Sequence, residues 1–176
     1  MKITLVGYMG SGKTTVGKHL ANALNLPFID LDSCISKQYG ASIPSIFSAK
    51  GEVYFRQIET QTLKELFENN KQFVLATGGG TPCYGNNMAL ILAQSVTVYL
   101  NVTPDVLCQR LFNKRHTRPL IAHLSTEDEL DTFIKKHLFE RRFFYEQAQE
   151  HMLIKNADYS AKDIARQLVT KVSALL

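Results

Sequence analysis

The chain has 176 residues, of which 45% are hydrophobic and 20% are charged. This length supplies one well-filled core and argues against a second full domain. A formal net charge of +4 makes the surface mildly basic, but lysine and arginine form no dense run interleaved with aromatic residues, as a nucleic-acid-binding protein would require. We therefore expect small anions as ligands and no nucleic-acid partner.

The three cysteines, Cys34, Cys83 and Cys108, include no CxxC pair, and their odd number argues against a disulfide framework or a structural zinc site. The first apolar run reaches glycine at Gly7, too early for a signal peptide, and no segment approaches membrane-spanning length. We expect a cytoplasmic protein with reduced thiols and no membrane contact, acting as a monomer with one domain, residues 1–176.

Strand and helix patterns alternate along the chain. Short apolar runs rich in β-forming residues predict strands at residues 3–6, 27–31, 73–76, 96–100 and 152–154, with helical patterns between them. Such strands imply an α/β fold with three layers, in which helices cover both faces of a five-stranded parallel sheet. Ligands are then expected at the carboxyl ends of the strands.

The first predicted strand leads into a P-loop, Gly-Tyr-Met-Gly-Ser-Gly-Lys-Thr at residues 7–14, which opens a helix to about residue 24. Its backbone N–H groups and the helix N-terminus suit phosphate. Lys13 is expected to reach the β and γ phosphates, and Thr14 to bind Mg²⁺. The predicted ATP-binding residues of this loop are Gly10, Ser11, Gly12, Lys13, Thr14 and Thr15.

Two alternatives to a metabolic kinase were weighed at this loop. One is a glycine-rich turn that precedes a helix by chance, which the strand, loop and helix context disfavours. The other is a GTPase switch protein, which needs a guanine-reading N-K-x-D. The pair Asn113-Lys114 is followed by Arg115 and His116, so that motif is incomplete.

The second predicted strand ends with Asp30-Leu31-Asp32. Because side chains alternate along a strand, both carboxylates point to the same side, towards the ligand crevice. One of them can orient Mg²⁺, directly or through water, while the other accepts the proton of the attacking hydroxyl. The alternative, equally weighted, is that Asp32 only caps the next helix.

The next helical pattern carries Arg56 with Glu59 three residues later. One interpretation is an internal salt bridge and nothing more. The other is that Glu59 fixes the guanidinium so that it binds a substrate carboxylate through two parallel hydrogen bonds.

Three glycines, Gly78, Gly79 and Gly80, follow the third predicted strand. They permit close approach of a ligand to the backbone and suit a wall of the acceptor pocket, the alternative being a plain turn. The preceding Thr77 is expected near the water shell of the metal.

The polar segment at residues 112–124 lacks helical periodicity and predicts a mobile loop. The helix from 127 to about 146 follows it, with Ser125 and Asp128 as the expected capping pair. Arg141 falls on the apolar stripe of this helix, three residues after Leu138. Because a guanidinium stays charged, its burial there requires an anion.

The ordered motifs together resemble the shikimate kinase family. They are the P-loop, D-L-D, F-R-x-x-E at 55–59, G-G-G, R-P-L at 118–120 and E-R-x-x-x-Y at 140–145. The resemblance covers residue 3 to beyond residue 145. It implies a P-loop fold of the nucleoside monophosphate kinase type, with a helical substrate-binding segment at about 33–62 and a lid at about 112–124.

The resemblance also implies ATP as co-substrate, Mg²⁺ as cofactor and shikimate as acceptor. Lys13, Asp32 and Arg118 would be catalytic, with Asp32 as the base and Arg118 brought by the lid to the transferring phosphate. Asp30 would act on Mg²⁺ through water. Arg110 would face either the nucleotide or solvent. The residues expected to bind shikimate are Asp32, Arg56, Gly78, Gly79, Gly80 and Arg141.

Two rival functions were considered. A gluconate or adenylate kinase would share the fold, but a nucleoside monophosphate has no carboxylate for Arg56 and Arg141 to bind. A regulatory nucleotide-binding protein without turnover would not need Lys13, Thr14 and both aspartates intact.

Overall fold

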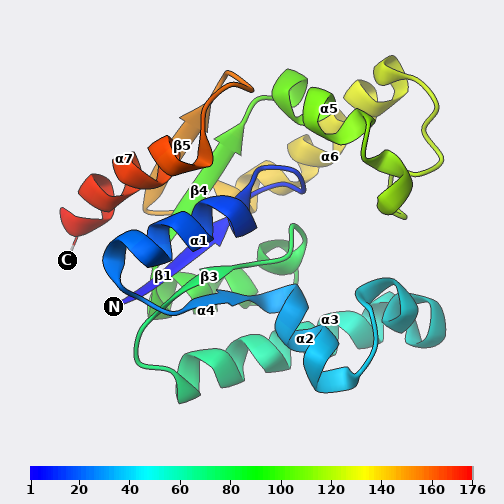
Figure 1. The fold of residues 1–176 in the computed structure, drawn as a ribbon. Coiled ribbons are helices and arrows are strands. Elements are labelled where there is room, and N and C mark those ends of the chain that lie inside the picture. The colour runs from blue at the N-terminus through cyan, green and yellow to red at the C-terminus, as the bar shows by residue number, and fades with distance from the viewer. Residues whose placement is uncertain (176) are drawn as a thin grey trace.

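The computed structural model describes residues 1–175 and has a five-stranded parallel sheet with helices on both faces (Figure 1). The predicted fold class is confirmed, and each expected strand is present. The strands lie in the order β2-β3-β1-β4-β5. Their bounds are β1 (Lys2–Val6), β2 (Phe28–Asp30), β3 (Phe73–Ala76), β4 (Val96–Val102) and β5 (Glu150–Ile154).

Alternation along the strands divides the core into two clusters, one on each face of the sheet. Leu5 belongs to the cluster that packs under α1 and α7, whereas its neighbour Val6 belongs to the cluster under α3 and α4. Figure 1 shows α1 and α7 side by side on one face and α4 behind the sheet. The helices are α1 (Lys13–Leu24), α2 (Leu31–Tyr39), α3 (Ile43–Asn69), α4 (Asn87–Gln94), α5 (Pro104–Phe112), α6 (Glu127–Tyr145) and α7 (Ala161–Ser173).

The strand order creates a crevice above the carboxyl end of β1. This strand pairs with β3 on one side and β4 on the other, so the chain leaves the sheet in opposite directions on its two sides. Ligands of open α/β sheets bind at such a point. The loop from β1 to α1, which is the P-loop, begins there.

Helix α3 is bent at Gly51, where φ is 81° and ψ is 173°. Residues that carry a side chain rarely adopt this backbone conformation, which glycine reaches without strain. The part after the bend carries Arg56 and Glu59 towards β3. The segment predicted to bind substrate, residues 33–62, therefore consists of most of α2 and the first two thirds of α3.

One predicted cap is wrong by a single residue. Thr126, not Ser125, is the N-cap of α6, and Glu129 completes a capping box with it. The predicted lid, residues 112–124, lies between α5 and α6 and contains the short 3₁₀ helix η2 (Arg115–Thr117). Within residues 1–175, no helix is both long and apolar enough to cross a membrane.

Candidate active site

A cavity of about 750 Å³ opens at the carboxyl ends of the strands. Its walls come from the P-loop, the start of α2, the loop after β3, the end of α5 and the start of α7. The predicted site residues that line it are Gly10, Ser11, Gly12, Lys13, Thr14, Thr15, Asp30, Asp32, Gly78, Gly79 and Arg118. Residues from all along the chain therefore meet in one space.

The P-loop has the open backbone that phosphate binding requires. Gly10 has a φ of 78°, and a Cβ there would lie 2.9 Å from the side chain of Leu111. Gly12 is the N-cap of α1 with a φ of 94°. Both positions therefore need glycine, and together they leave the first N–H groups of α1 facing the cavity.

Lys13 is the buried cation of the loop, with 8% of its surface exposed. Its ammonium group donates hydrogen bonds to the carbonyls of Gly7 at 2.8 Å and Tyr8 at 2.9 Å. Burial lowers the pKa of Lys13 to about 8, although the negative charge of Asp32 acts in the opposite direction. The loop thus holds a cation that an incoming phosphate would stabilise.

Asp30 joins the P-loop to the second strand. Its Oδ2 accepts a hydrogen bond from the Thr14 hydroxyl at 2.8 Å, and its Oδ1 accepts one from the Ser33 backbone N–H at 3.1 Å. Asp30 is therefore the N-cap of α2. The alternative prediction that Asp32 caps this helix is therefore wrong, because Asp30 occupies the N-cap position.

Asp32 lies in the first turn of α2 and not in the strand, so strand alternation does not explain its direction. It nevertheless lines the same cavity as Asp30. The residue is exposed at the cavity, with protein groups close around its carboxylate. Burial raises the pKa of Asp32 to about 6, with further contributions from the negative charges of Asp30 and Glu59.

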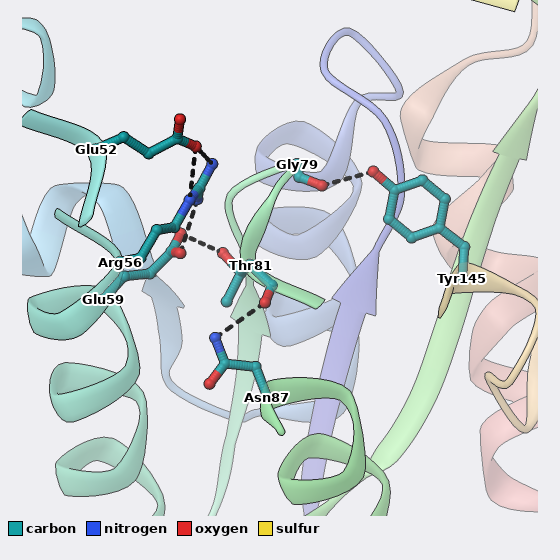
Figure 2. A network of polar contacts seen from close by, with 7 residues as sticks. All are labelled: Glu52, Arg56, Glu59, Gly79, Thr81, Asn87 and Tyr145. Atoms are coloured by element: carbon teal, nitrogen blue, oxygen red, sulfur yellow. Dashed lines mark hydrogen bonds and ion pairs between the residues drawn. The ribbon is translucent and has the colours of Figure 1, made fainter. Parts of the chain in front are cut away.

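Arg56 forms the expected ion pair with Glu59, at 2.8 Å, and a second pair with Glu52, at 3.3 Å (Figure 2). Glu59 is buried and Glu52 is exposed. A Cβ at Gly80 would lie 2.5 Å from the guanidinium of Arg56, so the absence of a side chain there makes room for it.

Arg141 lies on the opposite side of the glycine loop. Its guanidinium is over the ring of Tyr8, 5.9 Å from the centroid, and 3.7 Å from where a Cβ of Gly79 would be. Within residues 1–175, Arg141 forms no ion pair, whereas Arg56 forms two. A half-buried guanidinium without a carboxylate partner is a candidate binding group for an anionic ligand.

The glycine loop after β3 is held from both sides (Figure 2). The Tyr145 hydroxyl donates to the carbonyl of Gly79 at 2.5 Å, and Thr81 donates to Glu59 at 2.6 Å. Gly78 is enclosed, because a Cβ there would lie 3.1 Å from the carboxylates of Asp32 and Glu59. Thr77 donates to the carbonyl of Leu5 and also lines the cavity.

Arg56, Gly80 and Arg141 do not line the large cavity itself. The two arginines instead lie against the glycine loop, Arg56 at Gly80 and Arg141 at Gly79. The predicted site thus has two ends, one formed by the P-loop and one by the two arginines. Asp32, which lines the cavity and lies close to Gly78, is between them.

Two arginines reach the P-loop end from α5 and the segment after it. Arg110 donates to the carbonyls of Gly10 and Ser11 at 3.5 and 3.4 Å, and burial lowers its pKa. Arg110 therefore lies against the P-loop and lines the cavity, as an arginine that faces the nucleotide would. Arg118 also lines the cavity, and its buried Nε has no hydrogen-bond partner within residues 1–175.

Several lining residues were not predicted from sequence. They come from α5, the segment after it and the start of α7, and are Gln109, Asn113, Lys114, Tyr159, Ala161 and Ile164. The only local signal near the last three is the helix cap at Ser160. A cap marks where α7 begins but does not indicate that this end of α7 meets the P-loop.

Residues 9–173 match the family model described as shikimate kinase. A shikimate kinase of Flavobacterium johnsoniae is 43% identical over 166 residues, covering 93% of this chain and 96% of the relative. A shikimate kinase of Azobacteroides pseudotrichonymphae is 44% identical over 171 residues, covering 97% and 99%.

Solved structures agree with these relatives. Shikimate kinase from Bacteroides thetaiotaomicron has a TM-score of 0.87 at 37% identity and covers 98% of both chains. Shikimate kinase from Acinetobacter baumannii, in complex with shikimate, has a TM-score of 0.87 at 35% identity, covering 99% of this chain and 93% of that one. A gluconokinase from Sinorhizobium meliloti, 15% identical with a TM-score of 0.51, is similar in fold alone.

Proposed function

This chain belongs to the shikimate kinase family and transfers a phosphate from ATP to the 3-hydroxyl of shikimate, and we propose which of its residues perform each part of that reaction. The products are shikimate 3-phosphate and ADP, in the biosynthesis of aromatic amino acids. The observation that carries the assignment of roles is the arrangement of Asp32 between a phosphate-binding loop and two arginines.

The P-loop end binds the triphosphate of ATP. Gly10, Ser11, Gly12, Lys13, Thr14 and Thr15 line this end of the cavity at the N-terminus of α1. Their backbone N–H groups would bind the phosphates, apart from that of Ser11, which donates to the carbonyl of Tyr8 at 3.2 Å. Lys13 exchanges its carbonyl partners for phosphate oxygens. Arg118 adds a second positive charge, and its unpaired Nε supports this role. Both cations stabilise the negative charge that spreads over the transferring group.

The opposite end binds shikimate. The carboxylate of shikimate pairs with the guanidinium groups of Arg56 and Arg141, which lie on either side of the glycine loop. Gly78, Gly79 and Gly80 form a wall of the acceptor pocket beside these arginines. The small wall permits the ring of shikimate to approach the backbone closely.

Asp32 accepts the proton of the attacking hydroxyl. The hydroxyl oxygen forms a bond to the γ-phosphorus, the bond to the bridging oxygen breaks, and ADP leaves with that electron pair. The proton of the hydroxyl moves to the Asp32 carboxylate. A pKa of about 6 keeps Asp32 largely ionised at neutral pH and still basic enough to accept a proton.

Thr14 and Asp30 suit Mg²⁺. The Thr14 hydroxyl donates a hydrogen bond to Asp30, which leaves the oxygen lone pairs of Thr14 available to a cation. Mg²⁺ prefers such oxygen ligands. Residues 1–175 contain no cluster of three or more metal-binding side chains, so water and phosphate oxygens would complete the shell, with Asp30 acting through water. Bound Mg²⁺ would neutralise charge on the β and γ phosphates.

We extend the proposal to the lid, the assembly state and the compartment. Residues 112–124 close over the nucleotide and exclude water, bringing Arg118 to the phosphate. One chain supplies every residue of the proposed site, which supports a monomer. Three unpaired cysteines within the described residues are compatible with the reducing cytoplasm.

Substitution of Arg141 tests the proposed acceptor end. Arg141→Ala should raise the KM for shikimate about a hundredfold or abolish activity, because the carboxylate of shikimate loses one of its two guanidinium partners. The affinity for ATP, measured by calorimetry, should change less than about threefold. Arg142→Ala is the matched control, since the guanidinium of Arg142 is exposed and paired with Glu146. An equal loss of ATP affinity in Arg141→Ala would contradict the placement of Arg141.

A further inference from the structure

A chain of polar contacts leads from Arg56 away from the cavity into the protein interior (Figure 2). The guanidinium of Arg56 donates from Nη1 to Oε2 of Glu59 at 2.8 Å. The other oxygen of this carboxylate, Oε1, accepts a hydrogen bond from the Thr81 hydroxyl at 2.6 Å. Thr81 is fully buried and Glu59 is 1% exposed, so water is excluded from the contact between them.

The Thr81 hydroxyl is the sole hydrogen-bond donor to Oε1 of Glu59 within residues 1–175. A buried ion pair is stable only when additional hydrogen bonds satisfy the charged oxygens that the pair leaves free. Loss of the Thr81 hydroxyl would therefore leave half of a buried carboxylate unsatisfied. The carboxylate would turn towards another donor or admit water, and the direction of the Arg56 guanidinium would change with it.

The other ion pair of Arg56 cannot fix its direction equally well. Glu52 is exposed, and its contacts with Arg56 are 3.3 Å long. Exposed pairs at helical spacing are weak because solvent screens them and both side chains move. The buried Glu59 therefore dominates the orientation of Arg56.

Thr81 is itself held in place. It begins the short 3₁₀ helix η1 (Thr81–Cys83) directly after Gly80. The buried side chain of Asn87 donates to the carbonyl of Thr81 at 3.0 Å, and the N–H of Thr81 donates to the carbonyl of Gly78 at 3.3 Å. The hydroxyl thus projects from a fixed backbone.

We propose that Thr81 is a positioning residue for the acceptor: its hydroxyl orients Glu59, and Glu59 presents the Arg56 guanidinium to the carboxylate of shikimate. The inference rests on the proposed role of Arg56. It assigns a function to the residue after the third glycine, which touches neither substrate. Thr81 would act on acceptor binding and not on the nucleotide.

The test compares Thr81→Val with Thr81→Ser in steady-state kinetics at saturating ATP. Thr81→Val keeps the shape of the side chain and removes the hydroxyl, so the KM for shikimate should rise about tenfold while kcat and the KM for ATP stay within about twofold. Thr81→Ser retains the hydroxyl and should stay within about threefold of the parent for all three constants. Thr81→Ala, made in parallel, removes the hydroxyl without adding bulk.

Thr97→Val is the matched control. Thr97 is also fully buried, but it lies on β4, and its hydroxyl donates only a 3.4 Å hydrogen bond to the carbonyl of Ser95. Its constants should match those of the parent within about twofold. The inference is overturned if Thr81→Val and Thr81→Ala leave the KM for shikimate unchanged. It is also overturned if they raise both KM values equally, because that is the behaviour of a merely structural residue.

A double-mutant cycle with Arg56→Ala separates the inference from the proposed function. If Thr81 acts through Arg56, Thr81→Val should raise the KM for shikimate less than about twofold in the Arg56→Ala background. A full tenfold rise in that background would refute the relay. An Arg56→Ala variant with an unchanged KM for shikimate would refute both the proposed role of Arg56 and the inference. If Arg56→Ala raises this KM and Thr81→Val does not, the inference alone fails.

Discussion

The pKa of Asp32 is raised to about 6. The first cause is burial by the surrounding protein, and the second is the negative charge of Asp30 and Glu59. A base must be ionised before it accepts a proton. The value of kcat/KM for shikimate should therefore fall about tenfold for each pH unit below about 6, since this ratio reports the enzyme that has not yet bound shikimate. Initial rates between pH 5 and pH 8, with ATP and Mg²⁺ saturating, measure this limb.

Asp32→Asn serves as the companion variant for that profile. It removes the proton acceptor and should lower kcat by about 10² to 10⁴. The residual activity should lack the acidic limb. Near-parent kcat in this variant would mean that another group, or water, accepts the proton.

The residues of the P-loop could be predicted from sequence because their chemistry is local. Gly10, Gly12 and Lys13 act through backbone conformation and a helix N-terminus, both of which a short motif determines. The contact between Thr81 and Glu59 joins residues 22 positions apart, and no local pattern indicates it. Glu59 was identified only as a partner of Arg56, and the hydroxyl behind it appeared only in the structure.

At the scale of elements, local patterns predict that a helix starts but not always where. Ser125 with Asp128 and Thr126 with Glu129 both have the spacing of a capping pair. The structure uses the second pair, and a shift of one residue lies within what local sequence can determine. The same limit misplaced Asp32, because β2 ends at Asp30 and α2 starts at the next residue.

Helix α6 is tied to the glycine loop by one hydrogen bond, from the Tyr145 hydroxyl to the carbonyl of Gly79. The ring of Tyr145 is fully buried, and burial raises the pKa of its hydroxyl, so the hydroxyl remains a donor at any pH of interest. Tyr145→Phe should lower the free energy of unfolding by about 1 kcal/mol, the typical net value of such a bond. Urea unfolding followed by circular dichroism measures this change.

The same variant should raise the KM for shikimate a few-fold, because α6 also carries Arg141 and the bond fixes its distance from Gly79. Tyr84→Phe is the control, since this hydroxyl lies on an exposed side chain that does not line the cavity. Unchanged stability together with an unchanged KM in Tyr145→Phe would show that packing of the ring alone holds α6 in place.

At the scale of the whole molecule, the fold brings three carboxylates into one region before any ligand arrives. Burial, and then the charges of Asp30 and Glu59, raise the pKa of Asp32, whereas Lys13 and Arg56 only partly offset this effect. The arrangement favours catalysis, since a base with a raised pKa accepts a proton more readily. It also places an unfavourable charge in the folded state, so the catalytic site and the stability of the fold are opposed at this residue.

This opposition predicts that Asp32→Asn makes the ligand-free protein more stable at neutral pH. The folded protein binds the Asp32 proton with a pKa of about 6, against 3.8 as the ordinary value, so the contribution of Asp32 to stability is greatest below about pH 4 and is lost as pH rises to about 6. For a fully enclosed carboxyl group, this rise in pKa would lower the free energy of unfolding at neutral pH by about 3 kcal/mol. Asp32 faces water, and screening should reduce it to about 1 kcal/mol.

Urea unfolding of the parent and of Asp32→Asn at pH 4 and pH 7.5 tests this expectation. The two proteins should have similar stabilities at pH 4, where the parent carboxyl is protonated, and the variant should be more stable by about 1 kcal/mol at pH 7.5. Asp158→Asn, at an exposed aspartate outside the carboxylate group, should show no such difference between the two pH values. A variant that is less stable than the parent at pH 7.5 would mean that Lys13 and Arg56 outweigh the carboxylates. Asp32 would then contribute to the fold as well as to catalysis.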